Sequence, residues 1–249
     1  MATLHFPHFP ITDRPVDYPD SVVLEQRYPS VDAGDIEKDT FTITIQDDFP
    51  FLTSNNSGMK RVFRTNMQIE SSGKSVAVVC KLAMGRTHFV SLDKEAQKYE
   101  KNLKDLQGTV IPHIYGFFTG KSFDGITGVL VMEDCGEPLR FDSGDPKELQ
   151  QGLVDAMVAL HQRGGAVYTR GGLLSKNHVL ARRSLDGKLR VTIISFRDTS
   201  IDHPCKFKGK LILGEPTPEW EELCEELDYI IRNAHYYTMA EPPYTLLQS

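Results

Sequence analysis

The chain has 249 residues, 40% of them hydrophobic and 25% charged, so it is long enough to bury one large core or two smaller ones. Its formal net charge is −6 at pH 7, which argues against nucleic acid or an anionic membrane as a partner, because both select for surfaces rich in Lys and Arg. The sequence contains no stretch of 18 apolar residues and no secretory signal pattern, so we expect a cytoplasmic protein.

Residues 1–35 are predicted to form a proline-rich arm that lies outside the core. Proline removes a backbone donor and favours extended conformation, and this segment holds Pro7, Pro10, Pro15, Pro19 and Pro29. Its aromatic side chains Phe6, Phe9 and Tyr18 would anchor the arm either to its own domain or to a partner.

Residues 36–135 are predicted to be mostly sheet with one helix. Phe41, Ile43 and Ile45 alternate with threonines, which is typical of a strand, and the turn-rich "SSGK" joins two further strands into an antiparallel hairpin. An amphipathic helix is predicted to begin near Ser91 as its N-cap. The other strands expected here cover residues 59–71, 74–83, 109–120 and 126–134.

Residues 136–249 change character after "CGEPL", where residues 145–165 have the apolar spacing of a helix that ends on paired glycines. Two short strands, 178–183 and 189–195, are predicted to form a hairpin around Asp186 and Gly187. A second amphipathic helix is expected to begin near Thr217 or Pro218 and to bury Trp220.

The four cysteines show no local pairing. Cys80, Cys135, Cys205 and Cys224 stand far apart, without a C-x-x-C pair and without a histidine at zinc-finger spacing. We therefore expect reduced thiols and no metal site.

The order of these elements resembles the protein kinase fold, in particular compact fungal-type kinase-like proteins. "VAVVCK" is similar to the third strand of the kinase N-lobe, whose final Lys, here Lys81, holds nucleotide phosphates. Fourteen residues later Glu95 matches the helix Glu that pairs with this Lys. "VLVMEDCGEPL" resembles the fifth strand and hinge, so the resemblance implies that Met132, Glu133 and Cys135 face an adenine pocket.

The segment "YTRGGLLSKNHVL" resembles the kinase catalytic loop, with Asn177 setting the register. Gly172 then occupies the position of the catalytic Asp, and Arg170 that of the His. Further on, "VTIISFRDT" resembles the strand that leads into Asp-Phe-Gly, with Ser195 in place of the magnesium-binding Asp. The resemblance thus implies a site that has lost both carboxylates used in phosphoryl transfer.

The resemblance implies an α+β, two-lobed protein kinase-like fold, with an antiparallel N-lobe sheet and one helix in residues 36–135 and a reduced helical C-lobe in residues 136–249. We predict a catalytically inactive pseudokinase that acts as a regulatory scaffold and binds another protein, with no cofactor. One alternative is a divergent ATP-dependent phosphotransferase, or other nucleotide-dependent transferase, that uses ATP and Mg²⁺. Another is an unrelated α+β binding domain, which a structure lacking the kinase hinge and lobes would establish.

Several of these residues also have a simpler structural interpretation that requires no nucleotide or metal. Lys81 and Glu95 form a structural ion pair in one interpretation, and Asn177 braces its own loop in another. Asp198 becomes a metal ligand only if the register slips by three residues.

Overall fold

The computed structural model describes residues 1–9, 21–28, 39–45, 52–54, 58–122, 125–139, 147–168, 178–183, 187–212, 214–215, 218 and 222–233. The chain forms two compact units. Unit 1 consists of Met1–Cys135 with Ser195–Arg197, and unit 2 of Gly136–Ile194 with Asp198–Ser249.

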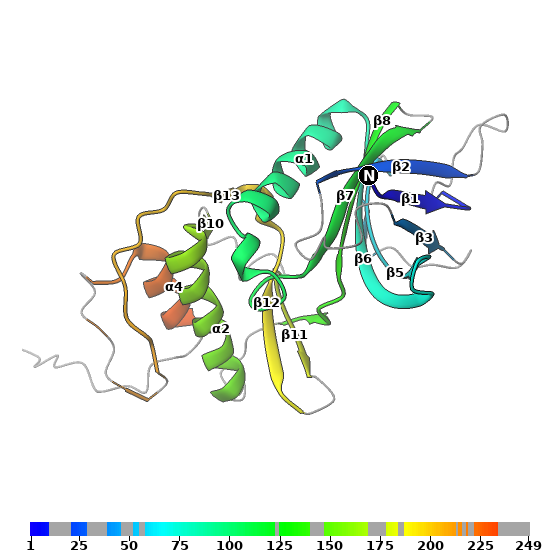
Figure 1. Ribbon diagram of the computed structural model, residues 1–249. Helices are drawn as coiled ribbons and strands as arrows, with labels where there is room; N and C mark the ends of the chain where they lie inside the picture. Colours follow the sequence, from blue (N-terminus) through cyan, green and yellow to red (C-terminus); the bar gives the residue numbers. More distant parts are fainter. Residues whose placement is uncertain are drawn as a thin grey trace, which may run out of the picture. The chain divides into compact units, whose positions relative to one another are not determined.

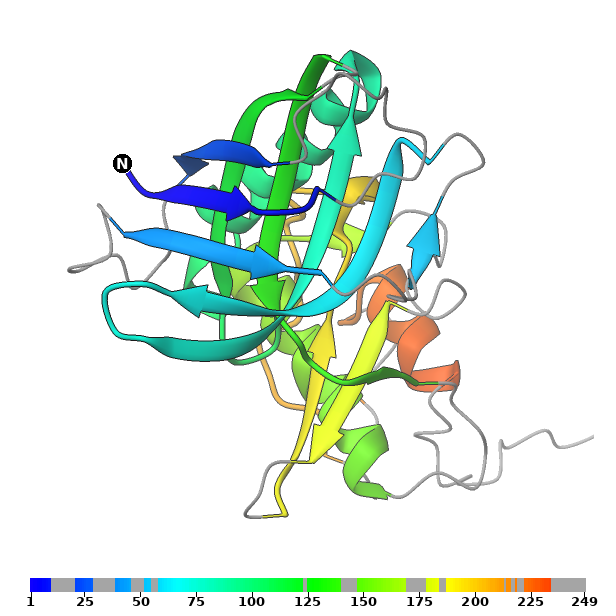
Figure 2. The same cartoon turned by 90° about the vertical axis from the view of Figure 1, so that its right-hand side faces the viewer.

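Seven strands of unit 1 close into a β-barrel (Figure 2). Around the ring they follow the order β3, β1, β2, β7, β8, β6 and β5, and β3 pairs with β5 to complete it. All the pairs are antiparallel except β1 with β3, and the short β4 (Thr53–Ser54) extends the edge beside β5. The barrel strands are β1 (Thr3–Phe6), β2 (Val22–Tyr28), β3 (Thr40–Thr44), β5 (Lys60–Ile69), β6 (Lys74–Met84), β7 (Ile114–Ser122) and β8 (Gly125–Glu133).

The apolar core of unit 1 follows from the period-two alternation of side chains along these strands. On β2, Val22 and Leu24 are buried while Val23 and Glu25 are exposed. Every barrel strand sends side chains into this core, which includes Leu4, Phe6, Leu24, Phe41, Phe63, Cys80 and Phe118. Complete burial raises the pKa of the Cys80 thiol far above its usual range, so Cys80 is a neutral core residue.

Helix α1 (Arg86–Lys101) packs on the outer side of the barrel against β8 and β6 (Figure 1). It begins after Gly85, earlier than the Ser91 N-cap predicted from the sequence. Gly85 has a φ of 73°, a left-handed conformation that glycine adopts without strain. A 3₁₀ turn (Lys104–Leu106) follows α1 and buries Leu106 against the same unit.

The two-lobed protein kinase-like fold expected from the sequence is wrong. Unit 1 is a closed barrel rather than an open N-lobe sheet, and the described residues contain only three α-helices, α1, α2 (Lys147–Ala159) and α4 (Glu225–Asn233). The difference arises within residues 1–35, where an arm was expected: Leu4 and Leu24 are fully buried. Strands β1 and β2 from this segment bridge β3 and β7 and thereby close the ring.

Unit 2 contains a helix packed on a small sheet. Gly152 allows this close approach, because a Cβ at this position would lie 2.8 Å from Cγ2 of Val191 on β12. Helix α4 packs against α2 and buries Leu227 and Ile230. The elements of unit 2 are β9 (Glu137–Pro138), α2 (Lys147–Ala159), the π-helix η3 (Leu160–Gly164), β10 (Val167–Tyr168), β11 (Val179–Arg183), β12 (Leu189–Ile193), β13 (Thr199–Ser200) and α4 (Glu225–Asn233).

The local predictions fared better than the overall fold. The strand at β3 and the antiparallel hairpins β5–β6 and β11–β12 are confirmed. The last helix begins at Glu225, later than predicted, and Trp220 lies outside the described residues. All four cysteines are free thiols, and every helix within the described ranges is too short or too polar to cross a lipid bilayer.

If β2 is a barrel strand, the two neighbouring residues Leu24 and Val23 should respond differently to truncation. Leu24→Ala should lower the free energy of unfolding by about 2–5 kcal/mol, because it leaves a cavity in the core. Val23→Ala is the matched control, since Val23 is 57% exposed, and should change stability by less than about 0.5 kcal/mol. Urea unfolding of the two variants measures both effects, and equal stabilities would contradict the barrel.

Candidate functional site

A cavity of about 200 Å³ lies in unit 1, between the barrel and α1. Its walls come from β4, β5, β6, α1 and the segment 195–197. The charged side chains that line it are Lys60, Arg61, Lys81, Glu95 and Arg197.

Barrel closure explains why Lys81 faces this cavity. Cys80 and Leu82 belong to the barrel core, so the residue between them must point to the outer side of β6. On the adjacent strand β5, Val62 is the register partner of Lys81, and Lys60 is the partner of Ala83. The same outer side of the hairpin therefore presents two lysines to α1.

Lys81 and Glu95 form a largely buried ion pair in the lining of the cavity. The Nζ of Lys81 donates a hydrogen bond to Oε1 of Glu95 at 2.6 Å, and the two side chains are 12% and 5% exposed. Burial, and to a smaller extent the charge of Glu95, raises the pKa of the Tyr99 hydroxyl well above its usual value. Because Lys81 donates this hydrogen bond, the Glu95 carboxylate already has a charged partner.

The cavity has an excess of positive charge. Four cationic side chains and one carboxylate are found among its described lining residues, although the chain as a whole carries a net charge of −6. The Nε of Arg61 donates to the carbonyl oxygen of Gly58 at 3.0 Å, which orients its guanidinium group. A partly enclosed site with this balance attracts anions.

The segment 195–197 is fastened to α1 by specific contacts. The Nζ of Lys98 donates to the carbonyl oxygens of Phe196 and Arg197 at 2.8 and 3.0 Å, and the Phe196 ring packs edge-on against Tyr99. The backbone N–H of Ser195 donates to the Tyr99 hydroxyl at 3.3 Å. Ser195 has a φ of 70°, which is unfavourable for a residue with a side chain, so these contacts hold a strained backbone at the wall of the cavity.

The structure brings together some residues predicted for a nucleotide site and separates others. Lys81, Glu95 and Ser195 line the same cavity. Met132, Glu133 and Cys135, which were expected to face adenine, do not line it: Met132 and Cys135 are buried, and Glu133 Oε2 accepts from the backbone N–H of His113 at 3.2 Å. The predicted loop residues Arg170, Gly172 and Asn177 lie outside the described residues.

Three of the cationic residues, Lys60, Arg61 and Arg197, were not predicted from the sequence. Lys60 and Arg61 are the first residues of strand β5, and Arg197 follows Ser195 by two residues in the segment that resembles Asp-Phe-Gly. The adjacent basic pair at the start of a strand was the available local signal. Nothing in the local sequence indicated that Arg197 would line the same cavity, because its position there depends on tertiary structure.

A larger hollow of about 450 Å³ in unit 2 is a weaker candidate for ligand binding. It lies between α2 and residues 209–212, and its charges are mixed. The side-chain amides of Gln151 and Gln162 donate to the carbonyl oxygens of Leu211 and Gly209 at 2.7 and 2.9 Å. Those amides already serve to attach one wall of the hollow to the other.

Comparison with known proteins adds no family to this description. No protein-family model matches the sequence, and no curated protein matches it as a relative.

Removing one partner of the buried ion pair should lower the free energy of unfolding substantially. Glu95→Ala leaves the Lys81 charge among other cations, and we expect a loss of about 3 kcal/mol in the free energy of unfolding. Combining Glu95→Leu with Lys81→Met should recover most of this loss, because an apolar pair leaves no buried charge.

The exposed pair of Arg183 and Glu148, which is 3.0 Å apart with both side chains more than half exposed, provides the control. Glu148→Ala should cost less than about 1 kcal/mol. Chemical denaturation of the wild type and the three variants measures these differences. A small loss of stability for Glu95→Ala would show that the Lys81–Glu95 pair is effectively solvated.

The backbone strain at Ser195 predicts a stabilising substitution. Ser195→Gly should raise the free energy of unfolding by about 0.5–1 kcal/mol, because glycine adopts a φ of 70° without steric cost. Ser195→Ala retains the Cβ and serves as the control. A glycine variant no more stable than the alanine variant in thermal unfolding would mean that Ser195 is unstrained.

Proposed function

We propose that the protein binds a small phosphate-bearing anion in the cavity beside α1. The observation that carries this proposal is the convergence of Lys60, Arg61, Lys81 and Arg197 around a site whose single described carboxylate is already paired. Phosphate oxygens accept several charge-assisted hydrogen bonds at once, and guanidinium and ammonium groups supply them.

The size of the cavity favours a compact ligand. Sites for drug-sized molecules usually measure about 300–1,000 Å³, whereas this cavity measures about 200 Å³. Met132, Glu133 and Cys135 do not line it, so the cavity offers none of the adenine contacts expected from the sequence. Both points support inorganic phosphate or a small phosphorylated metabolite in preference to a whole nucleoside triphosphate.

Binding, rather than turnover, is the activity that the described lining residues support best. Glu95 is the carboxylate among them, and Lys81 holds it at 2.6 Å, so it is poorly placed to accept a proton from a substrate. Regulation through a protein partner stays a prediction from the sequence. In this proposal, anion binding in the cavity would control the interaction with that partner.

A thermal unfolding titration tests the proposal directly. Inorganic phosphate and pyrophosphate should raise the unfolding temperature in a saturable manner, since ligand at 100 times its dissociation constant adds about 2.7 kcal/mol of stability. Potassium chloride at matched ionic strength controls for screening of surface charge. An equal effect of chloride and phosphate would contradict the proposal.

Charge-removing variants locate the binding site. Lys60→Ala and Arg197→Ala should each weaken phosphate binding about tenfold, because each removes one charge-assisted contact. Lys74→Ala is the matched control, since Lys74 is an exposed cation at the other end of the β5–β6 hairpin and does not line the cavity. A similar loss in all three variants would indicate nonspecific attraction instead of a site.

A further inference from the structure

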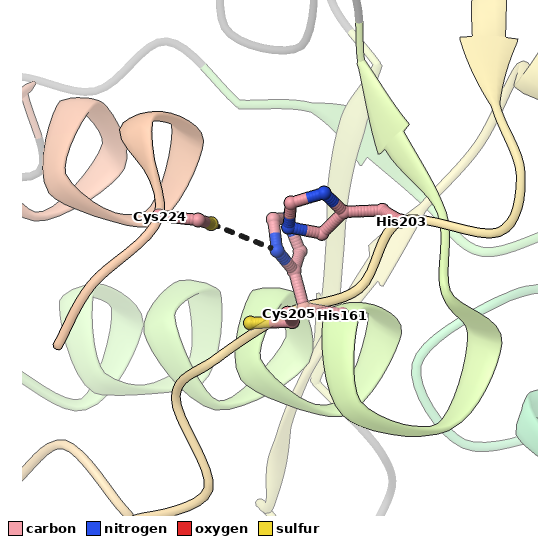
Figure 3. A group of neighbouring side chains, drawn as sticks. All are labelled: His161, His203, Cys205 and Cys224. Atoms are coloured by element: carbon pink, nitrogen blue, oxygen red, sulfur yellow. Dashed lines mark hydrogen bonds between the residues drawn. The ribbon is translucent and has the colours of Figure 1, made fainter.

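Two histidines and two cysteines of unit 2 converge on one point (Figure 3). His161 lies in the π-helix η3, His203 and Cys205 lie in the irregular segment after β13, and Cys224 directly precedes α4. One potential ligand atom from each residue falls within 4.8 Å of the other three. His161 and Cys205 are buried, and the other two residues are partly buried.

Glu226 holds His161 in the orientation that a metal ligand needs. The Nε2–H of His161 donates to Oε2 of Glu226 at 2.9 Å, which leaves Nδ1 as the nitrogen with a lone pair. Nδ1 faces the Sγ of Cys224 at 3.2 Å. Glu226 is fixed in turn, because its carboxylate oxygens accept the backbone N–H of Tyr168 at 3.0 Å. A carboxylate behind a ligating histidine is the usual outer support of a zinc site.

His203 supplies an independent indication of a missing ligand. Its Nε2 is buried and has no hydrogen-bond partner, which is costly for a polar atom inside a protein. The ring lies against His161, with the centroids 5.1 Å apart. Cys205 follows two residues later, and its backbone N–H donates to the carbonyl oxygen of His203 at 2.9 Å, so one tight turn carries both ligands.

We propose that His161, His203, Cys205 and Cys224 bind one Zn²⁺ ion. Two thiolates and two neutral imidazoles are a common tetrahedral set for this ion, and the two negative charges neutralise it in a buried site. Bonds of about 2.0 Å to nitrogen and 2.3 Å to sulfur place tetrahedral ligand atoms about 3.3–3.8 Å apart. The four side chains need only small movements to reach this geometry.

The proposed site is structural. Four protein ligands fill a tetrahedral shell, whereas catalytic zinc keeps a position open for water or substrate. The ion would join η3, the segment 203–205 and the residue that precedes α4, which are far apart in the sequence. All four proposed ligands belong to unit 2, whereas the residues that line the anion cavity belong to unit 1.

Metal binding by the full chain tests the proposal. The protein is reduced, stripped with a chelator and titrated with Zn²⁺ against a chromophoric competitor. We expect one tightly bound ion per chain and a higher unfolding temperature. Co²⁺ in place of Zn²⁺ should give the visible absorption of tetrahedral cobalt bound to thiolates. A reduced protein that takes up no Zn²⁺ would overturn the proposal.

Variants assign the ion to these residues. Cys224→Ala should abolish tight binding and the cobalt–thiolate absorption, whereas Cys80→Ala, which removes a buried thiol from the barrel core, should leave both unchanged. Glu226→Gln should weaken Zn²⁺ binding about 10- to 100-fold while preserving its one-to-one stoichiometry. This milder variant keeps the proposal testable if Cys224→Ala fails to fold, and an unchanged affinity in Glu226→Gln would refute the role of its carboxylate.

A disulfide is the competing interpretation, because Cys205 and Cys224 are close enough to be joined after a small shift. Mass spectrometry of the purified protein distinguishes the two. A chain that is lighter by two hydrogen atoms, yields a peptide pair linked through these cysteines and resists mild reductant would overturn the zinc site. Two free thiols that alkylating reagents modify only after zinc is removed would support it.

Discussion

Strand β3 closes the barrel of unit 1, because it pairs with β1 on one side and with β5 on the other. Without these pairings the sheet would have two open edges, each with unpaired backbone groups. Closure also decides which face of every strand is interior. Once Cys80 and Leu82 are committed to the core, Lys81 has to face α1, and the ion pair with Glu95 follows. The cationic cavity is therefore a consequence of how the ring closes.

The parts of the fold that depend on neighbouring residues were predictable from the sequence. Alternation and turn residues were sufficient for the β5–β6 and β11–β12 hairpins. The barrel was not predicted, because β1 and β2 join the ring through β3 and β7, far along the chain. Alternation in "VVLEQRY" at residues 22–28 was visible, but the surrounding prolines made an arm the preferred interpretation. A resemblance based on the order of elements did not specify how the strands pair.

The same distinction applies to the two sites. The pairing of Lys81 with Glu95 was expected from the kinase resemblance and is present, whereas Arg197 comes to the cavity from a distant segment and was not predicted. The histidine and cysteine cluster was missed because its members come from three segments. His203 and Cys205 form its sole local pair, and a search limited to C-x-x-C or zinc-finger spacing passes over them.

The placement of β1 and β2 has a consequence for how the protein folds. The β5–β6 and β7–β8 hairpins join neighbouring strands and can form early, whereas β2 must wait for β7, and β3 for β5. Closing a long loop lowers the chain entropy before the contacts that stabilise the closed loop have formed. Completion of the ring should therefore be a late and slow step in folding. Until then the open edges of β5 and β7 can pair with a second chain. Dilute protein should consequently refold in higher yield than concentrated protein.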